Sequence, residues 1–235
     1  MTSVPFFITL LLCSLTVFAN PAKTISMTEV IFQQSETGLE PYLSRLLVND
    51  KFIRLDDGEN QGDFILFNRQ QKTIQSVNYE EQNLLNINPP VQQKINLKLK
   101  FEVQQQDLPD APAIAGNKPQ QNLLLADNKL CQSVINVPGL LPQVQLAMIE
   151  YEMVIAAQNA VTLEFTPNEI KTGCYMATNI LHRTRYLELG FPLQYQDYLG
   201  KTQRLVGYKQ VDIPASILFA PESFTIYSPG EMQQN

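Results

Sequence analysis

The stretch Ile95-Asn96-Leu97-Lys98-Leu99-Lys100-Phe101-Glu102-Val103 carries the clearest structural signal in this chain of 235 residues. Apolar and polar side chains alternate along it without interruption, which is typical of a β-strand that buries one face and leaves the other in water. Such a strand needs neighbouring strands and a core beneath it. The stretch therefore predicts a strand over residues 95–103, within an antiparallel sheet that has one solvated face.

Shorter apolar runs with strand-like composition precede this stretch, and clusters of Asn, Asp, Gly and Pro separate them. They cover residues 28–33, 42–48, 52–55, 64–67, 73–79 and 84–87. Short strands at intervals of about ten residues are typical of a curled antiparallel sheet and not of alternating β-α-β units. The first half of the chain is therefore predicted to be a meander.

Residues 104–121 are rich in Gln, Pro and Ala, show no period, and are predicted to form a long connection. The runs 123–126 and 130–137 follow, with Asp127-Asn128-Lys129 between them. Asp and Asn tolerate the left-handed backbone that a tight turn requires. This pattern predicts one more β-hairpin.

Residues 142–160 have helical composition and contain no glycine. Placing residues 100° apart puts Val144, Met148, Tyr151 and Ile155 on one apolar face, and Leu146, Ile149, Met153, Ala156 and Ala160 on another. Gln145, Glu152 and Asn159 form a polar stripe between the two faces. Because a surface helix has a single apolar face, this helix is predicted to lie between two layers, either as a buried core helix or as a lid over a cavity.

Thr166-Pro167-Asn168-Glu169 matches a capping box, with proline suited to the first helical position. It predicts a second helix that carries Ile170, Cys174, Ala177 and Leu181 on one stripe. Strand-like runs return at residues 193–198, 204–211 and 224–227. The expected fold is mainly β with α (α+β). It is one curled antiparallel sheet or half-barrel over residues 20–235, with two central helices at about 142–182 packed on it.

Residues 1–19 contain no charged side chain, and most of residues 6–19 are apolar. This pattern predicts a secretory signal peptide, since the apolar run is shorter than the roughly 20 residues of a membrane span. Leu10-Leu11-Leu12 before Cys13 argues against lipidation at that cysteine. We therefore expect a periplasmic or secreted protein without a transmembrane segment after cleavage.

Cys131 and Cys174 are the cysteines outside the predicted signal peptide. In an oxidising compartment two such residues favour one structural disulfide. The alternative is a redox or metal-binding pair, for which the chain offers neither a Cys-x-x-Cys spacing nor more than one histidine.

The composition excludes several classes of function. Seventeen basic and 23 acidic residues give a net charge of −6, which disfavours nucleic acid and anionic membrane surfaces as partners. His182 is the only histidine, so the chain lacks the residues for most nucleophile–histidine catalytic sites and for zinc sites. The acidic stretch 56–63 favours a hairpin turn over a calcium site. We expect no enzymatic activity, metal or cofactor, and keep an exported hydrolase as a third hypothesis.

The meander 42–103, the helices 142–181 and the strands 193–211 together resemble the periplasmic lipoprotein-carrier half-barrels, the LolA/LolB-like group. The resemblance implies a protein that binds acyl chains on the concave apolar side of its sheet, beneath helices. A binding or carrier protein for a lipid or an acylated partner is therefore the first hypothesis. The expected ligand-lining residues are Leu97, Leu99, Phe101, Met148, Tyr151 and Ile155. A structural or interaction protein of the cell envelope is the alternative.

Overall fold

The computed structural model describes residues 23–88 and 95–229, and one large sheet organises this part of the chain. The strands are β1 (Thr24–Ser35), β2 (Tyr42–Val48), β3 (Phe52–Asp56), β4 (Phe64–Asn68), β5 (Thr73–Asn78), β6 (Asn83–Ile87), β7 (Phe101–Asp107), β8 (Gln120–Ala126), β9 (Lys129–Val137), β10 (Phe191–Asp197), β11 (Thr202–Pro214) and β12 (Thr225–Tyr227). Their order across the sheet is β12-β6-β5-β4-β3-β2-β1-β11-β10-β9-β8-β7. The edge strands β12 and β7 do not pair with each other, so the sheet curls without closing.

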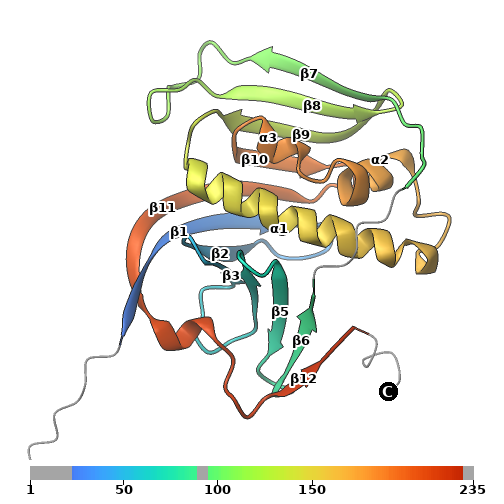
Figure 1. Cartoon of the computed structure of the whole chain (residues 1–235). Coiled ribbons are helices and arrows are strands. Elements are labelled where there is room, and N and C mark those ends of the chain that lie inside the picture. The colour runs from blue at the N-terminus through green and yellow to red at the C-terminus, as the bar shows by residue number, and fades with distance from the viewer. Residues whose placement is uncertain (1–22, 89–94, 230–235) are drawn as a thin grey trace, which may run out of the picture.

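The sheet is built from two halves that meet where the two long strands pair. Strands β1 to β6 follow one another as the predicted meander, and β7 to β11 continue on the other side. Strand β11 pairs with β1 along its whole length, from Thr24↔Pro214 to Ser35↔Thr202. Figure 1 shows this pair in the middle of the molecule. All neighbouring strands are antiparallel except β12, which runs parallel to β6.

The helices lie between β9 and β10 in the sequence, apart from one short turn before β12. They are α1 (Pro142–Val161), a 3₁₀ turn η1 (Leu163–Phe165), α2 (Gly173–Met176), a π-helical turn η2 (Ala177–Leu181), α3 (Arg185–Glu188) and a 3₁₀ turn η3 (Ala215–Leu218). Helix α1 crosses one face of the sheet, and the shorter helices lie beside it (Figure 1). The α+β fold class and the helix over 142–160 are therefore confirmed. No helix in the described residues is long and apolar enough to cross a membrane.

Two hydrophobic cores lie on opposite faces of the sheet. Under α1, the buried side chains Val144 and Met148 pack with Phe32, Phe67 and Phe191 of the strands. The first apolar face predicted for α1 is therefore the face that contacts the sheet. The second core lies on the other side, where Met27, Leu47, Phe64, Leu66, Val77, Leu84, Ile213 and Leu218 pack together.

The strand predicted at residues 95–103 is largely wrong, because pairing begins only at Phe101 and continues to Asp107. The chain from 95 to 100 forms no strand. Ile95 and Leu99 instead pack against helical residues in a cluster with Ile180. The alternating pattern thus buries apolar side chains on helices and not on a sheet.

The connection predicted at residues 104–121 is too long. Gln104 to Asp107 belong to β7, and Gln120 and Gln121 begin β8. The amide side chains of these residues face solvent or half-buried surface, so they carry no apolar alternation although their backbone pairs regularly. The hairpin β8–β9 is confirmed, and both Asp127 and Asn128 adopt the left-handed backbone at its turn.

The second helix is present, as α2 and η2, but its predicted start at the capping box of Thr166 is wrong. Thr166 follows η1, and the amide of Ile170 donates to the carbonyl of Pro167 in an irregular turn. The helix begins at Gly173, where the hydroxyl of Thr172 accepts a hydrogen bond from the amide of Tyr175 at 3.2 Å. A second threonine further along the chain is thus the actual cap.

The predicted disulfide joins Cys131 of β9 to Cys174 of α2 and is present. It packs among Ala126 and Ala177 in a small buried cluster, so it fixes the short helices to the sheet. The predicted signal peptide at residues 1–19 lies outside the described residues.

Candidate functional site

The six residues predicted to line an apolar cavity do not come together. Met148 and Tyr151 border a cavity of about 100 Å³ under α1, and Ile155 packs against the core there. The other three lie at residues 95–100 and at the start of β7. They are Leu97, which is 44% exposed, Leu99, which packs with Ile180, and Phe101, which packs near the disulfide.

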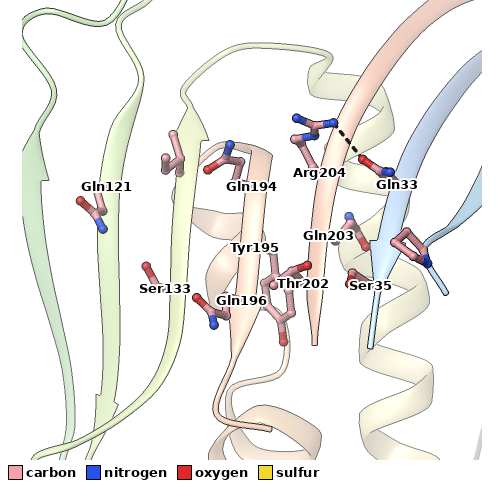
Figure 2. Close-up of a pocket in the computed structure, with 12 residues that line it drawn as sticks. Gln33, Ser35, Gln121, Ser133, Gln194, Tyr195, Gln196, Thr202, Gln203 and Arg204 are labelled. Carbon is pink, nitrogen blue, oxygen red and sulfur yellow. Dashed lines mark hydrogen bonds between the residues drawn. The ribbon is translucent and has the colours of Figure 1, made fainter. Parts of the chain in front are cut away.

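A groove of about 610 Å³ lies on the face of the sheet turned away from α1. Phe32 and Gln34 of β1 point toward α1, so Gln33 and Ser35 point to the other face. The lining is Gln33, Ser35, Pro41, Gln121, Ser133, Ile135, Gln194, Tyr195, Gln196, Thr202, Gln203 and Arg204. Figure 2 shows amide and hydroxyl groups from five strands spread over this surface.

The groove on the outer sheet face is lined mainly by hydrogen-bonding side chains. Arg204 is the one charged side chain in its lining, and its Nη2 donates to Oε1 of Gln33 at 2.8 Å (Figure 2). Among the described residues that line it there is no carboxylate or imidazole to act as a general base. The groove thus offers hydrogen bonds and no evident acid–base chemistry.

A second groove, of about 340 Å³, follows the solvent side of α1. We call it the α1 groove. Its lining is Ile95, Ile149, Met153, Ala156, Ala157, Ala160, Ile180, Leu181, Arg183, Thr184 and Glu188. One wall is formed by Ile149, Met153, Ala156 and Ala160 of the second apolar face predicted for the helix, and the other is the chain from η2 to α3. Met153 is 58% exposed on its rim, while small alanine side chains leave the floor recessed.

A third hollow, of about 330 Å³, lies between the helices and strands β1, β9, β10 and β11 and reaches the surface at Leu199 and Lys201. We call it the inner cavity. Its lining is Gln34, Gln132, Glu152, Thr178, Asn179, Arg183, Tyr186, Tyr195, Asp197, Tyr198, Leu199, Lys201 and Gln203. The 100 Å³ cavity under α1 shares four of these residues with it: Gln34, Glu152, Tyr186 and Gln203. The inner cavity is therefore mainly polar, whereas apolar side chains such as Phe32, Ile53 and Met148 also line the smaller cavity under α1.

Two charged side chains that line the inner cavity, Arg183 and Glu152, form an ion pair. Nε of Arg183 donates to Oε2 of Glu152. Burial by itself would lower the pKa of Arg183, but the adjacent Glu152 carboxylate raises it. Burial raises the pKa of Tyr195 to about 12 and that of Tyr186 well above its ordinary value, with Glu152 adding to the effect. Both phenols are thus protonated at neutral pH and available as hydrogen-bond donors.

The polar stripe of α1 attaches the segment from η2 to α3 to the helix. Nε2 of Gln145 donates to the carbonyl of Leu187 at 2.6 Å, and Nδ2 of Asn159 donates to that of Asn179 at 3.1 Å. Glu152, between them, pairs with Arg183. Sequence reasoning found this stripe but not its partners, since short irregular helices have no regular pattern.

The remaining candidates from the sequence belong to the structure and not to a site. The ring of His182 lies 3.9 Å, centroid to centroid, from that of Phe101, and it does not line any of the three hollows described above. Burial lowers the pKa of His182, and the nearby positive charge of Arg185 lowers it further. In the acidic stretch, Asp56 accepts from two arginines and Asp63 accepts from the amide of Tyr79. No group of three metal-ligating side chains occurs in residues 23–88 and 95–229.

Comparisons with known proteins leave the chain without a family. No family model matches it, and no curated protein does. Two structures of PNGF-II, in space groups C2 and P21, align with 89% of the chain at 12% and 10% identity, with TM-scores of 0.44 and 0.39. The chain covers 32% and 33% of those proteins. Similarity at this level assigns no function.

Proposed function

We propose that this protein is an exported binding or carrier protein for an apolar ligand, such as a lipid or an acylated partner, and that the α1 groove holds the ligand. One observation carries the proposal. Helix α1 buries its first apolar face against the sheet, yet its second apolar face borders an open groove, where Ile180 and Leu181 lie opposite it beside the polar side chains of Arg183, Thr184 and Glu188. Exposed apolar surface rimmed by polar residues is typical of interaction sites.

The dimensions of the α1 groove suit a single extended acyl chain. From Ile149 to Ala160 the helix rises by about 17 Å at 1.5 Å per residue. Each methylene group that leaves water for such a groove contributes about 0.8 kcal/mol. The thioether of Met153 adapts to varied apolar shapes, which suits a carrier.

The proposed ligand site differs in position from that of the lipoprotein carriers that the sequence resembles. In that group acyl chains bind between helices and the concave face of the sheet. Here side chains fill that interface, and the hollows left within it are lined in part by Gln34 and Glu152. An apolar chain placed there would separate polar groups from their partners, which favours the solvent side of α1.

Export is part of the proposal. The apolar run at residues 1–19 supports it, and so does the disulfide between Cys131 and Cys174, since disulfides persist in oxidising compartments. Both are compatible with a periplasmic or secreted protein.

The second candidate function is an interaction protein of the cell envelope. The groove on the outer sheet face favours it, because a broad surface of glutamine, serine and threonine side chains can form many hydrogen bonds with a partner. Capture of one stable protein partner through this face, with no lipid binding, would favour the second candidate.

A charge-insertion pair of variants tests the α1 groove. Met153→Glu places a carboxylate on the rim of the groove and retains a good helix former, so the fold is expected to persist. Titration with a fluorescent long-chain fatty acid should show saturable binding to the wild type. We expect Met153→Glu to weaken that binding by about tenfold or more, equivalent to about 1.4 kcal/mol.

The matched control is Leu146→Glu. Leu146 is 47% exposed on the same helix but does not line the groove. Its replacement should leave the affinity within about twofold, a difference of roughly 0.4 kcal/mol. Absence of binding to the wild type, or equal loss in both variants, would refute the α1 groove as the ligand site.

A further inference from the structure

Strand β7 forms one edge of the sheet, and no strand in residues 23–88 and 95–229 pairs with its outer side (Figure 1). It has seven residues, pairs with β8 without a register shift, and contains neither lysine nor proline. Natural proteins blunt exposed edges with short strands, bulges, proline or lysine. The opposite edge strand, β12, is short, with three residues. Strand β7 lacks each of these features and therefore offers a template for another strand.

The contact that precedes β7 shows which backbone groups lie on its free side. The amide of Asp127 donates to the carbonyl of Lys100 at 2.8 Å, and the amide of Lys100 donates to Oδ1 of Asp127 at 2.9 Å. Both backbone groups of Lys100 therefore face the side of β8. Since successive residues of an antiparallel strand alternate in this respect, the groups that point away from β8 are those of Phe101, Val103, Gln105 and Asp107.

A second copy of β7 satisfies all of these groups in one antiparallel register. With Gln104 of both copies on a two-fold axis, Phe101 lies opposite Asp107, and Val103 lies opposite Gln105. Each pair joins two outward-facing residues, so it exchanges two backbone hydrogen bonds, and the symmetry repeats both pairs. A shift by one residue would place outward-facing groups opposite groups that bond to β8, and a shift by two would leave fewer of them paired.

The side chains of β7 are compatible with the same register. Glu102 lies opposite Gln106 of the second copy, whose amide can donate to the carboxylate. The two Gln104 amides face each other and can both donate and accept. Glu102 and Asp107, the charged side chains of β7, each face an uncharged residue. No like charges are therefore opposed across the strands, although the chain carries a net charge of −6.

We propose that two copies of this chain associate through their β7 edges, in the antiparallel register centred on Gln104, to form one continuous sheet. Directly opposite residues of paired strands have their side chains on the same face of the sheet, so the two-fold axis is perpendicular to it. Helix α1 of each copy then lies on the same side of the joint sheet (Figure 1). The two α1 grooves open on one face of the dimer.

Sedimentation velocity of the protein over a range of micromolar concentrations tests this dimer. The wild type should sediment as a reversible dimer. Gln105→Pro removes an outward N–H and leaves the bonds to β8 in place, so it should weaken dimerisation by about tenfold or more. Gln105→Thr changes the same side chain but keeps the N–H, and should stay within about threefold of the wild type. A wild type that is monomeric throughout, or equal dimerisation of both variants, would overturn the proposal.

A pair of charge variants tests the register and provides the measurement if Gln105→Pro does not fold. Gln104 is exposed, so the fold is expected to persist in both Gln104→Lys and Gln104→Glu. Each variant alone opposes like charges at the two-fold axis and should dimerise about tenfold more weakly at low salt. Their mixture should form a heterodimer. A mixture that associates no better than either variant alone would refute this register. Pairing of β7 with peptides of other proteins, in a chain that stays monomeric, would refute the dimer.

Discussion

Replacing Asp56 with asparagine should lower the free energy of unfolding by about 4 kcal/mol, because it leaves a buried cation unpaired. Oδ1 and Oδ2 of Asp56 accept from Nε and Nη2 of Arg45, both at 2.8 Å. Oδ2 also accepts from Nε of Arg54, and neither the Asp56 nor the Arg54 side chain is exposed. The Arg54 guanidinium lies 3.9 Å from the centroid of the Phe64 ring, so it cannot move to water without disturbing the second core.

Urea unfolding of the wild type, Asp56→Asn and a neighbouring control variant, Asp57→Asn, measures this loss of stability. Asp57 is exposed, and its Oδ1 accepts from the amide of Glu59, a bond that asparagine can keep. The control should change stability by less than about 0.5 kcal/mol. A difference below about 1 kcal/mol between the two variants would show that the charge of Asp56 does not stabilise the fold.

The same carboxylate makes stability depend on acid pH. Burial alone would raise the pKa of Asp56, but hydrogen bonds from Arg45 and Arg54 bring it below its ordinary value of 3.8. A group whose pKa is lower in the folded state contributes its stabilisation above the unfolded value and loses it as pH falls through the folded value. The wild type should therefore lose more stability than Asp56→Asn as pH drops below about 3.8.

Removal of the disulfide in a Cys131→Ala, Cys174→Ala double variant should have an effect of similar size, about 4 kcal/mol in the chain-entropy model. The bridge closes a loop across a sequence separation of 43. Helix α2 has four residues and cannot hold its conformation without such a tie. Because η2 forms one wall of the α1 groove, the loss of order should reach that groove.

Urea unfolding gives the global effect, and hydrogen exchange locates it. Amides of residues 173–184 should exchange faster in the double variant by a larger factor than amides of α1. Reduced wild-type protein serves as the control, since it lacks the bridge and keeps both cysteine side chains. A double variant as stable as the oxidised wild type, with unchanged exchange at 173–184, would contradict the tethering role.

The parts of the fold that the sequence predicted are those with regular, local patterns. The strands from Tyr42 to Ile87 alternate with turn-forming residues, and α1 has a long helical repeat, so both were recognised. The hairpin turn at Asp127-Asn128 needs left-handed backbone, and its residue types indicate it. The pairing of β1 with β11 joins residues far apart in the chain, and no local pattern encodes it.

The errors also have physical causes. Residues 95–100 bury Ile95 and Leu99 on helices, which gives the same alternation as a strand on a sheet. The capping pattern at Thr166 competes with that of Thr172, and only tertiary packing decides between them.

The sequence predicted only some of the residues that line the candidate sites. The two apolar faces of α1 predicted one wall of the α1 groove, including Ile149 and Met153, but not the wall from Ile180 and Leu181. The inner cavity depends on Gln34, Tyr186 and Tyr195, which are brought together by strand pairing and by the irregular helical segment.

Photo-crosslinking of a fatty acid with a photoreactive group in its chain, followed by mass spectrometry of peptides, tests the proposed carrier function most directly. The α1 groove predicts adducts concentrated in peptides that contain residues 149–160 and 180–184, and their loss in the presence of excess unlabelled fatty acid. Absence of competable adducts, or adducts confined to other segments such as the outer sheet face, would contradict the account.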